Sequence, residues 1–556
     1  MKARGIFVSL LIILICALFF INSCGKSDSP SSAKAITEYS LNGVAGTINE
    51  TEKTIAVTMP VLTNVTALVA TFNTTGTNVN VGITAQESGT TANNFTSPVA
   101  YTVIAADGST ATYTVTVKAG AWYNPASTTD NISPDGQNAY WTNYIWHKQI
   151  AMDDNGNIII VWMESDGTNS HIFKSERWNG IWTYPANLSD HISLNGQDAI
   201  EPHVAMDNNG NAIIVWMQSD GANLQVFKSE RRNGVWANPT SLSDHISPSG
   251  QDVGWNDPLM GTAQVAMDNN GNAIIVWYQS DGSTQQIFKS EYRNGAWQHP
   301  ANLADNIGIT RAAQPQVAMD DNDNAIIVFI ASDGSYSQIF KSEYRNGSWH
   351  HAASNLDNIS PDGRHAFAPQ VAMANNGDAV IVWGQFGNDT YRVYKSEYRS
   401  GAWVNPTDLS DFISPNWGRF PQVEMENNGN AIIIWDLYFN TDSDPYGMIE
   451  YRNSAWSNPV NLKFNGENIR PTHMAMDDNG NAIIVWPQSD STKTQVFKSE
   501  YRDGAWHDPT NLSDNISSSG QGGNNPLVAM GNNGEAIIAY QGSDGTNCQI
   551  FKSEYR

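Results

Sequence analysis

Four arginines stand outside the motif that repeats along the chain. In four successive copies of the repeat, one arginine precedes a short apolar strand that ends in methionine: Arg311, Arg364, Arg419 and Arg470. A guanidinium group forms two parallel hydrogen bonds with a carboxylate, so arginines gathered in one sector would suit an anionic ligand. The alternative is four unrelated surface charges, because charged side chains in loops are usually solvated.

A second group of candidates is aromatic. The stretch YWTNYIWHK contains Tyr140, Trp141 and Trp146, and a later loop contains Trp255. Aromatic faces stack on sugar rings and anchor protein partners, so all four are ligand-binding candidates. Packing of the same rings against the sandwich domain of residues 37–118 is the competing interpretation.

Catalysis would need an acid, a nucleophile and a cause for shifted pKa values. The carboxylates in suitable loops are Glu201, Asp257, Asp436 and Glu467. No spacing distinguishes a pair among them, and the sequence has no Ser-His-Asp order, zinc motif or phosphate loop. His203 and His473 stand one to a repeat without a second ligand nearby, which indicates structural roles. The catalytic residues are therefore left unassigned, and binding is favoured over catalysis.

The sequence MDNNGN around Asp207 invites a calcium interpretation. Asp207, Asn209 and Asn211 alternate like the ligands of a calcium loop. A glycine at the fourth position and Gln218 at the twelfth do not fit an EF-hand, and another copy replaces the aspartate with Ala374. A tight turn is favoured, and no cofactor is expected.

These candidates are positioned by a repeated unit whose marker is a methionine at the end of a short strand. The eight copies are Met152, Met206, Met267, Met319, Met373, Met425, Met476 and Met530. The third copy reads as four strands: AQVAMD, AIIVWYQSD, QIFKSEYR and AWQHP, separated by turns such as NNGN and NG. The third strand alternates, so we expect it to be less buried than the second. Eight such units predict an eight-bladed β-propeller, with a solenoid as the alternative.

The two ends of the repeat region distinguish a ring from a row. The last copy stops at Arg556 after its third strand, and GAWYNP (residues 120–125) stands unattached before the first copy. We expect residues 120–125 to pair with residues 549–556, because a row would leave two bare sheet edges. In such a ring the loops from strand two to three and from strand four to one share a face. Two segments depart from the repeat there, residues 385–389 and 436–446, and they indicate the binding face.

This architecture resembles the sialidase-like propellers with BNR or Asp-box repeats, over residues 120–556. Their motif is Ser-x-Asp-x-Gly-x-x-Trp; Ser290 and Trp297 keep its ends, but Tyr292 and Asn294 replace the aspartate and the glycine. Sialidases hold the substrate carboxylate with an arginine triad. The resemblance therefore implies an anionic glycan for the four arginines, and a glycoside hydrolase or polysaccharide lyase as the alternative function.

The N-terminus reads as an export signal. Basic residues precede the apolar run from residue 6 to 21, and INSC, ending at Cys24, resembles the lipobox of bacterial lipoproteins. This implies a signal peptide over residues 1–23, lipidation of Cys24 and a flexible tether over residues 24–36. An ordinary secretory signal is the alternative. With Cys16 and Cys24 so used, Cys548 has no disulfide partner.

Residues 37–118 have a different texture, with Thr and Val in alternation. The pattern predicts a small antiparallel sandwich, and its ending YTVIAADGSTATYTVTV resembles the final hairpin of Ig-like or cadherin-like modules in bacterial surface proteins. The expected role is that of a spacer.

Composition excludes one class of partner. The 55 acidic residues outnumber the 30 basic ones, which gives a net charge of −25 and argues against nucleic-acid binding. The 19 tryptophans among many Gly, Asn and Asp residues favour an all-β protein. We therefore expect a monomeric lipoprotein of the outer membrane or cell surface that touches the membrane only through its lipid. Its propeller would bind a glycan or a protein on the loop-rich face.

Overall fold

The structure is a computed structural model that describes most of the chain. The described residues are 29–59, 65–141, 148–254, 263–387, 390–437, 446–462, 473–489, 492–502, 504–517 and 522–556, without the side chain of residue 119. The predicted signal peptide and Cys24 lie outside these ranges, as do Trp146, Trp255 and Arg470. In the described ranges no helix has the length and apolar character needed to cross a membrane.

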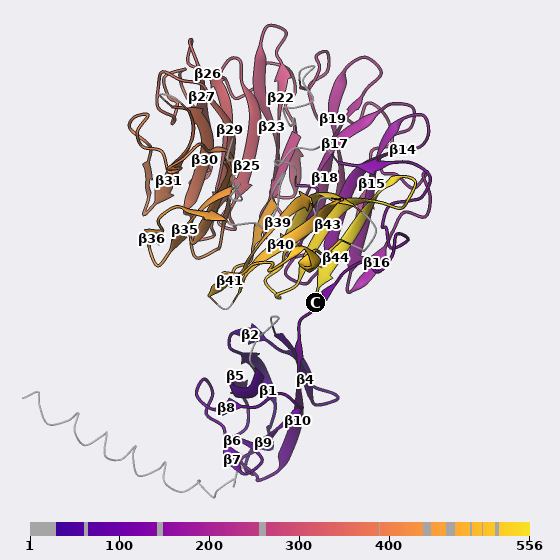
Figure 1. The fold of residues 1–556 in the computed structure, drawn as a ribbon, viewed down its shortest axis with the longest axis vertical. Coiled ribbons are helices and arrows are strands. Elements are labelled where there is room, and N and C mark those ends of the chain that lie inside the picture. The colour runs from indigo at the N-terminus through magenta and orange to yellow at the C-terminus, as the bar shows by residue number, and fades with distance from the viewer. Residues whose placement is uncertain are drawn as a thin grey trace, which may run out of the picture. The chain divides into compact units, whose positions relative to one another are not determined.

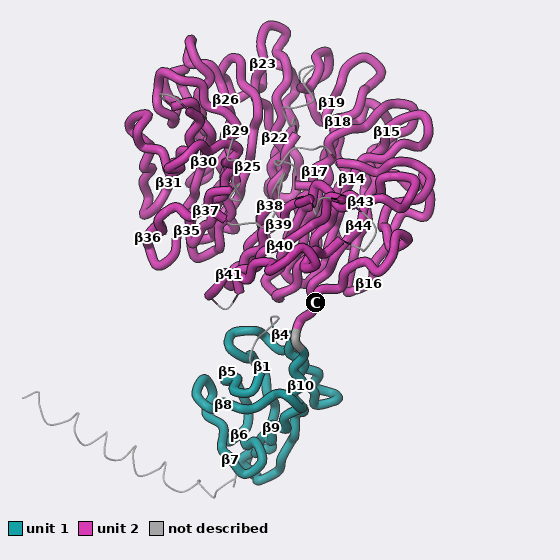
Figure 2. Tube along the Cα trace, in the orientation of Figure 1, with its two compact units in different colours: residues 1–119 teal, residues 120–556 magenta. Residues whose placement is uncertain are grey.

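The chain divides into two compact units, residues 1–119 and 120–556 (Figure 2). The prediction of an all-β protein is confirmed for the described residues. They form strands, many of them in four-stranded sheets, with only two short 3-10 turns, η1 (Val65–Ala67) and η2 (Leu512–Asp514).

Unit 1 contains two sheets, with strand orders β2-β1-β5-β8 and β3-β4-β10-β9-β6-β7. The strands are β1 (Ile36–Leu41), β2 (Val44–Ala45), β3 (Thr47–Asn49), β4 (Thr54–Met59), β5 (Leu68–Thr74), β6 (Asn78–Val81), β7 (Thr84–Ala85), β8 (Ala92–Asn93), β9 (Val99–Ile104) and β10 (Thr110–Ala119). Alternate side chains are buried, as in β4, where Ile55, Val57 and Met59 enter the shared core. The prediction of an antiparallel sandwich is wrong at one pairing. Strands β4 and β10 run parallel, which the long connection through β5 to β9 permits.

The described residues of unit 2 form eight sheets, numbered here 1 to 8 in chain order (Figure 1). Their first strands are β13 (Ile150–Met152), β17 (Ala199–Met206), β21 (Ala263–Met267), β25 (Ala313–Met319), β29 (Ala366–Met373), β33 (Arg419–Met425), β38 (His473–Met476) and β42 (Gly523–Met530). Sheet 1 also has β12 (Ala139–Tyr140), which pairs with the same second strand as β13. The marker methionine thus ends the first strand in every sheet.

The second strands are almost wholly buried, as their apolar sequences predict. They are β14 (Ile158–Ser165), β18 (Ala212–Ser219), β22 (Ala273–Ser280), β26 (Ala325–Ser332), β30 (Ala379–Phe386), β34 (Ala431–Asp436), β39 (Ala482–Ser489) and β43 (Ala536–Ser543). The third strands are β15 (Ser170–Trp178), β19 (Leu224–Arg232), β23 (Gln285–Arg293), β27 (Ser337–Arg345), β31 (Tyr391–Arg399), β35 (Tyr446–Arg452), β40 (Thr494–Arg502) and β44 (Cys548–Tyr555).

The fourth strands are short and lie at the outer edge of each sheet. They are β16 (Ile181–Thr183), β20 (Val235–Ala237), β24 (Ala296–Gln298), β28 (Ser348–His350), β32 (Ala402–Val404), β36 (Ala455–Trp456), β41 (Ala505–His507) and, for sheet 8, β11 (Trp122–Tyr123). Sheet 6 has an extra strand, β37 (Val460–Leu462), paired with β35.

The fourth strand of sheet 8 comes from the other end of unit 2. Trp122 of β11 is opposite Tyr555 of β44, and Tyr123 is opposite Glu554. This is the pairing that the sequence predicted for residues 120–125. Each first strand also contacts the next, including β42 of sheet 8 with β13 of sheet 1, so the circle of sheets is closed. In Figure 1 the yellow end of the chain accordingly lies beside the purple strands of sheet 1.

Neighbouring sheets are joined by one repeated hydrogen bond. The indole N–H of the fourth-strand tryptophan donates to a glutamate on the third strand of the preceding sheet, at 2.5–2.9 Å. The pairs are Trp182–Glu554, Trp236–Glu176, Trp297–Glu230, Trp349–Glu291, Trp403–Glu343, Trp456–Glu397, Trp506–Glu450 and Trp122–Glu500. Every boundary between sheets is bridged in this way, including the two that β11 and β44 complete.

In most sheets, a lysine and an arginine of the sequence KSEYRNGAW add further contacts to the junction. In sheet 3, Glu291 also accepts from Lys289 and from Arg293 Nε, the latter at 3.1 Å, and the guanidinium of Arg293 lies 3.9 Å from the ring centroid of Tyr344 in sheet 4. Glu291 is only 8% exposed. The third strand is still less buried than the second, as expected: Lys289 and Arg293 are half-buried although the tryptophan of the next sheet covers this face, whereas the second strand is buried as far as Gln279.

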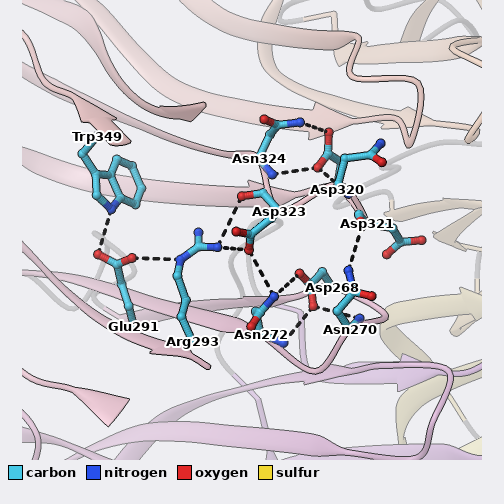
Figure 3. A network of polar contacts seen from close by, with 11 residues as sticks. Asp268, Asn270, Asn272, Glu291, Arg293, Asp320, Asp321, Asp323, Asn324 and Trp349 are labelled. Carbon is cyan, nitrogen blue, oxygen red and sulfur yellow. Dashed lines mark hydrogen bonds and ion pairs between the residues drawn. The ribbon is translucent and has the colours of Figure 1, made fainter. Parts of the chain in front are cut away.

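The turns after the first strands form a second circle of contacts. Asp268 accepts from the backbone N–H groups of Asn270 and Asn272, at 3.0 and 2.7 Å, and from the Asn272 side chain at 2.8 Å. The Asn270 amide then donates to the carbonyl of Asp321 in sheet 4, at 2.7 Å (Figure 3). The same pattern at Asp207 makes MDNNGN a tight turn, as the sequence favoured.

A chain of backbone donors also runs through these turns. In seven sheets, the backbone N–H of the residue two positions after the marker methionine donates to an Asn or Asp side chain of the next sheet, at 2.6–3.0 Å. The last of these bonds, from Asn532 to Asp154, returns to sheet 1. Between sheets 5 and 6 the link is instead from Asn376 Nδ2 to the carbonyl of Asn428. Both circles of polar contacts are thus continuous around unit 2.

We predict that the closing junction stabilises the fold as much as an internal one. Trp122→Phe and Trp349→Phe each remove one indole donor from a glutamate and should each lower the unfolding free energy by about 1.5–3 kcal/mol, the usual value for a hydrogen bond to a charged group. Urea unfolding followed by circular dichroism measures both. Val235→Ala, at a fourth-strand residue that is 70% exposed, is the control and should change little. An unchanged midpoint for Trp122→Phe alone would contradict a closed circle.

Candidate functional site

One register position differs from sheet to sheet at the loop end of the first strands. In each second strand, one residue directly follows the large aromatic residue. The varying position is its cross-strand partner, which lies on the first strand or, in sheet 1, on β12. The described residues at this position are Tyr140, Ile200, Ala313, Phe367, Arg419 and Asn524, which we call the mouth residues. All six are at least partly exposed. Their variation contrasts with the marker methionine, which is the same in all eight copies.

A β-bulge follows the mouth residue in five sheets. The residue there has a left-handed backbone, with φ from 48° to 53°, although none is a glycine: Glu201, Gln314, Ala368, Phe420 and Asn525. Such a conformation costs an L-residue about 1–2 kcal/mol. Bulges and strained backbone concentrate next to binding sites, where they turn a side chain out of the strand alternation.

Sheets 5 and 6 carry an aromatic cluster at this end. Phe367 lies edge-on to Tyr391 at 5.5 Å and to Phe420 at 5.8 Å, and Phe386 lies 5.1 Å from Tyr391 between ring centroids. The guanidinium of Arg419 lies 5.0 Å from the Phe420 centroid. All of these side chains are partly exposed. We call the group, together with Asp436, the aromatic sector: Phe367, Phe386, Tyr391, Arg419, Phe420 and Asp436.

A glycine makes room for Phe367. Gly384 pairs with it, and a Cβ at residue 384 would lie 2.5 Å from the Phe367 ring. Sheets 1 and 2 have Met163 and Met217 at the same register. The loss of the side chain at residue 384 is therefore what lets the phenylalanine ring lie across the strand pair.

Arg419 also forms an ion pair with Asp436 inside the sector. Its Nε lies 3.3 Å from Asp436 Oδ2, and the two residues are direct partners across β33 and β34. Asp436 begins one of the two segments that depart from the repeat, and Phe386 belongs to the other. The sequence pointed to both segments, but not to the rings that meet between them.

The other predicted arginines in the described residues, Arg311 and Arg364, lie before the first strands of sheets 4 and 5, but not at the mouth position. Arg311 is exposed and left-handed, with φ 57°, and its backbone N–H donates to Thr284 Oγ1 at 3.1 Å. Arg364 is half-buried, and its carbonyl accepts from Gln385 Nε2 at 3.1 Å. Because Arg470 lies outside the described residues, a shared site for the four arginines stays a prediction.

The predicted aromatic candidates differ in exposure. Tyr140 is 40% exposed and is a mouth residue, whereas Trp141 is 2% exposed and packs in the core between sheets 8 and 1. The Trp141 indole N–H donates to the carbonyl of Asn525 at 2.9 Å. Trp141 therefore cannot present its ring to a ligand, because the ring fills the core between sheets 8 and 1. Trp146 and Trp255 lie outside the described residues.

Of the four carboxylates named from the sequence, Glu201 and Asp436 lie in the described residues. Glu201 is 3% exposed, and Asp436 is paired with Arg419. Asp257 and Glu467 lie outside the described residues. Within the described part of the chain, no group of three or more His, Cys, Asp or Glu residues could hold a metal ion.

The two histidines of the first strands bond to backbone between sheets. His203 Nδ1 accepts from the Lys148 N–H, and His473 Nδ1 accepts from the Val528 N–H, both at 3.3 Å. Burial lowers the pKa of His473 to about 4, helped by the charge of Lys148, so its imidazole is neutral at physiological pH. Structural roles were predicted for both, and these contacts agree.

The loops at the mouth are held by buried glutamines. Gln218 Nε2 donates to the carbonyls of Leu194 and Gln197 at 2.6 and 3.0 Å, while its Oε1 accepts from Trp216. Sheet 1 has Glu164 at this position, wholly buried and accepting from Trp162 at 2.9 Å. Burial raises the pKa of Glu164 from 4.5 to about 8, opposed by the Trp162 hydrogen bond and reinforced by Asp135. The carboxyl group is therefore protonated at neutral pH.

Comparison with known protein families gives a match for unit 1. Residues 36–117 match the family model described as SGBP, N-terminal, the surface glycan-binding proteins. No curated protein matches the chain. The match lies within unit 1, so it says nothing directly about unit 2.

Solved structures resemble the chain only in fold. Polysaccharide lyase Uly1 is 10% identical over 78% of this chain and 97% of its own, with a TM-score of 0.42. A protein of unknown function from Dyadobacter fermentans is 10% identical over 78% and 99%, with a TM-score of 0.35. The six-bladed lectin of Aleuria aurantia is 13% identical over 58% and 97%, with a TM-score of 0.30. Likenesses this weak decide neither the number of blades nor an activity.

We predict that Glu164 makes stability fall as pH rises. The folded state holds a proton that the unfolded chain releases near pH 4.5, so stability is full below that pH and declines up to about pH 8, by about 1.4 kcal/mol per pH unit. Glu164→Gln should remove this decline and raise the urea midpoint at pH 8 but not at pH 4. Gln218→Glu is the matched change and should introduce the same slope in sheet 2. Parallel pH profiles for wild type and Glu164→Gln would refute the assignment.

Proposed function

We propose that the protein binds a glycan at the cell surface through the aromatic sector and does not cleave it. The observation that carries this proposal is the set of partly exposed rings around Phe367 and Phe420, placed beside the pair of Arg419 and Asp436. Sugar rings have apolar faces that stack on aromatic side chains, and hydroxyl groups that both donate and accept hydrogen bonds. Asp436 would accept from a hydroxyl, and Arg419 would donate to one. The match of residues 36–117 to surface glycan-binding proteins supports the same class of ligand.

The arrangement favours recognition because its parts are held in advance. The phenylalanine rings are fixed edge-to-face, Gly384 keeps Phe367 in place, and Arg419 is oriented by Asp436. A preorganised site loses less conformational entropy on binding. The carrier, in this proposal, is an eight-bladed β-propeller over residues 120–556.

The remaining regions would deliver the propeller to the surface. We propose a signal peptide over residues 1–23, a lipidated Cys24 with its tether to residue 36, and an Ig-like spacer over residues 37–118. The protein would act as a monomer, without a cofactor, and would touch the membrane through its lipid alone.

We predict that Phe420→Ala and Arg419→Ala each weaken glycan binding by about tenfold or more, since loss of about 1.4 kcal/mol changes affinity tenfold. Binding is measured by affinity electrophoresis against a panel of neutral and acidic polysaccharides, then by calorimetry with the polymer that binds. Val404→Ala is the control, an exposed apolar residue on the fourth strand of sheet 5. Wild-type affinity in both variants would refute the site.

The same incubations separate binding from cleavage. A binding protein returns the polymer at its original length, whereas a glycoside hydrolase or a lyase shortens it. New reducing ends or unsaturated products from the wild type would therefore establish the alternative function.

We further predict that Gly384→Met weakens binding by about tenfold without unfolding the protein. Methionine stands at this register in sheets 1 and 2, so the strand pair tolerates it, but at residue 384 it must displace the Phe367 ring. Ile330→Met makes the same residue at the same register in sheet 4 and should leave affinity unchanged. Unaltered affinity in Gly384→Met would show that the position of Phe367 does not matter.

A further inference from the structure

Internal repetition offers a test of how many ligands unit 2 holds. Where a contact serves the fold, it recurs in every sheet: the fourth-strand tryptophan donates to a glutamate at all eight boundaries. A pocket for one kind of sugar in each sheet would repeat its residues in the same way. The mouth would then show one residue type, as the marker methionine does.

The mouth shows the opposite pattern. Its six described residues are of six different types, Tyr140, Ile200, Ala313, Phe367, Arg419 and Asn524. The residues paired with them also differ, except that sheets 1 and 2 both have methionine. Side chains that differ in this way cannot recognise the same group in each sheet.

The varied positions contact each other across sheet boundaries. Phe367 of sheet 5 meets Phe420 of sheet 6, and the Ala368 N–H of sheet 5 donates to Gln314 Oε1 of sheet 4 at 3.1 Å. Between sheets 8 and 1, Trp141 donates to the Asn525 carbonyl. The strand ends that carry the mouth residues are thus in contact at these boundaries, and partly exposed rings meet at the boundary between sheets 5 and 6.

The chemistry of this surface changes along the circle. Sheets 5 and 6 offer rings and one ion pair, while sheet 8 offers amides: Asn524 is exposed, and Asn525 Nδ2 donates to Gln541 Oε1 at 2.7 Å. Amides suit polar groups through paired donors and acceptors, whereas rings suit the apolar faces of sugars. A ligand that uses both sectors must be longer than one sugar.

We infer that the mouth binds one glycan chain per protein, as a stretch of several sugars laid across several sheets. This rests on the proposed function and deepens it. Sheets 5 and 6 hold the main contact, and the amide sector of sheet 8 extends the site. The ligand class is therefore a chain of several sugars that spans more than one sheet, and not a monosaccharide bound once in each sheet.

The test uses size-fractionated oligosaccharides made from the polymer that binds, together with its constituent monosaccharides. Calorimetry and native mass spectrometry should give one oligosaccharide per protein, with affinity rising with chain length. The monosaccharides should bind at least about 100-fold more weakly, the loss expected from two missing contacts of tenfold each.

Two variants locate the ends of the site. Phe420→Ala should weaken binding of every fragment, whereas Asn524→Ala should weaken only the longer ones, by about tenfold. Asn524 is exposed, so its loss should leave the fold intact, and an unchanged urea midpoint verifies this. Several equivalents of one monosaccharide per protein, or a wild-type length profile in Asn524→Ala, would overturn the inference while leaving glycan binding itself in place. If no polymer binds the wild type, the proposed function fails instead.

Discussion

The bond between the tryptophan indole and the glutamate of the preceding sheet is the contact on which unit 2 depends. Six of the eight glutamates have a lysine two residues before them and an arginine two residues after, so one buried carboxylate can receive three donors, as Glu291 does. A buried charge with its partners in place is tolerated, whereas removal of one donor leaves the rest poorly compensated. Because every sheet supplies one donor and one acceptor to its neighbours, the pattern is satisfied everywhere only when the last sheet meets the first.

This arrangement separates the residues that fasten the fold from those free to vary. The outer strands carry the tryptophan junctions, and the turns after the first strands carry the Asn and Asp circle, as around Asp268 and Asp321 (Figure 3). The loop end of the first strands is free of both. Substitutions such as Phe367 with Gly384 can accumulate there without disturbing a boundary between sheets. The mouth can therefore change its chemistry while the repeat keeps its sequence.

Much of the fold could be predicted from the sequence, because repetition made weak signals add. The recurring methionine, the NG turns and the apolar second strands gave the strand order, and GAWYNP before the first copy gave the pairing of β11 with β44. The turn at Asp207 was also predicted, since its neighbours are amides and not carboxylates.

The site was harder to predict, for physical reasons. A left-handed Phe420 or Glu201 has no local signature, because its strain is held by the surrounding strands. The meeting of Phe367, Tyr391 and Phe420 depends on a register between sheets that no single repeat specifies. Trp141 was predicted as a ligand-binding candidate because it stands where the sequence departs from the repeat. In the structure its ring fills the junction between sheets 8 and 1.

The short strand β11 has a mechanical consequence. It is at once the last piece of sheet 8 and the first piece of unit 2 along the chain, so any tension transmitted from residue 119 enters the ring there. Two opposed residue pairs, the Trp122 indole bonded to Glu500 and the Lys498 ammonium over the same ring must bear that load. Under flow or traction, the seam of the ring would be its first point of failure, and the mouth would lose its shape only after that seam had opened.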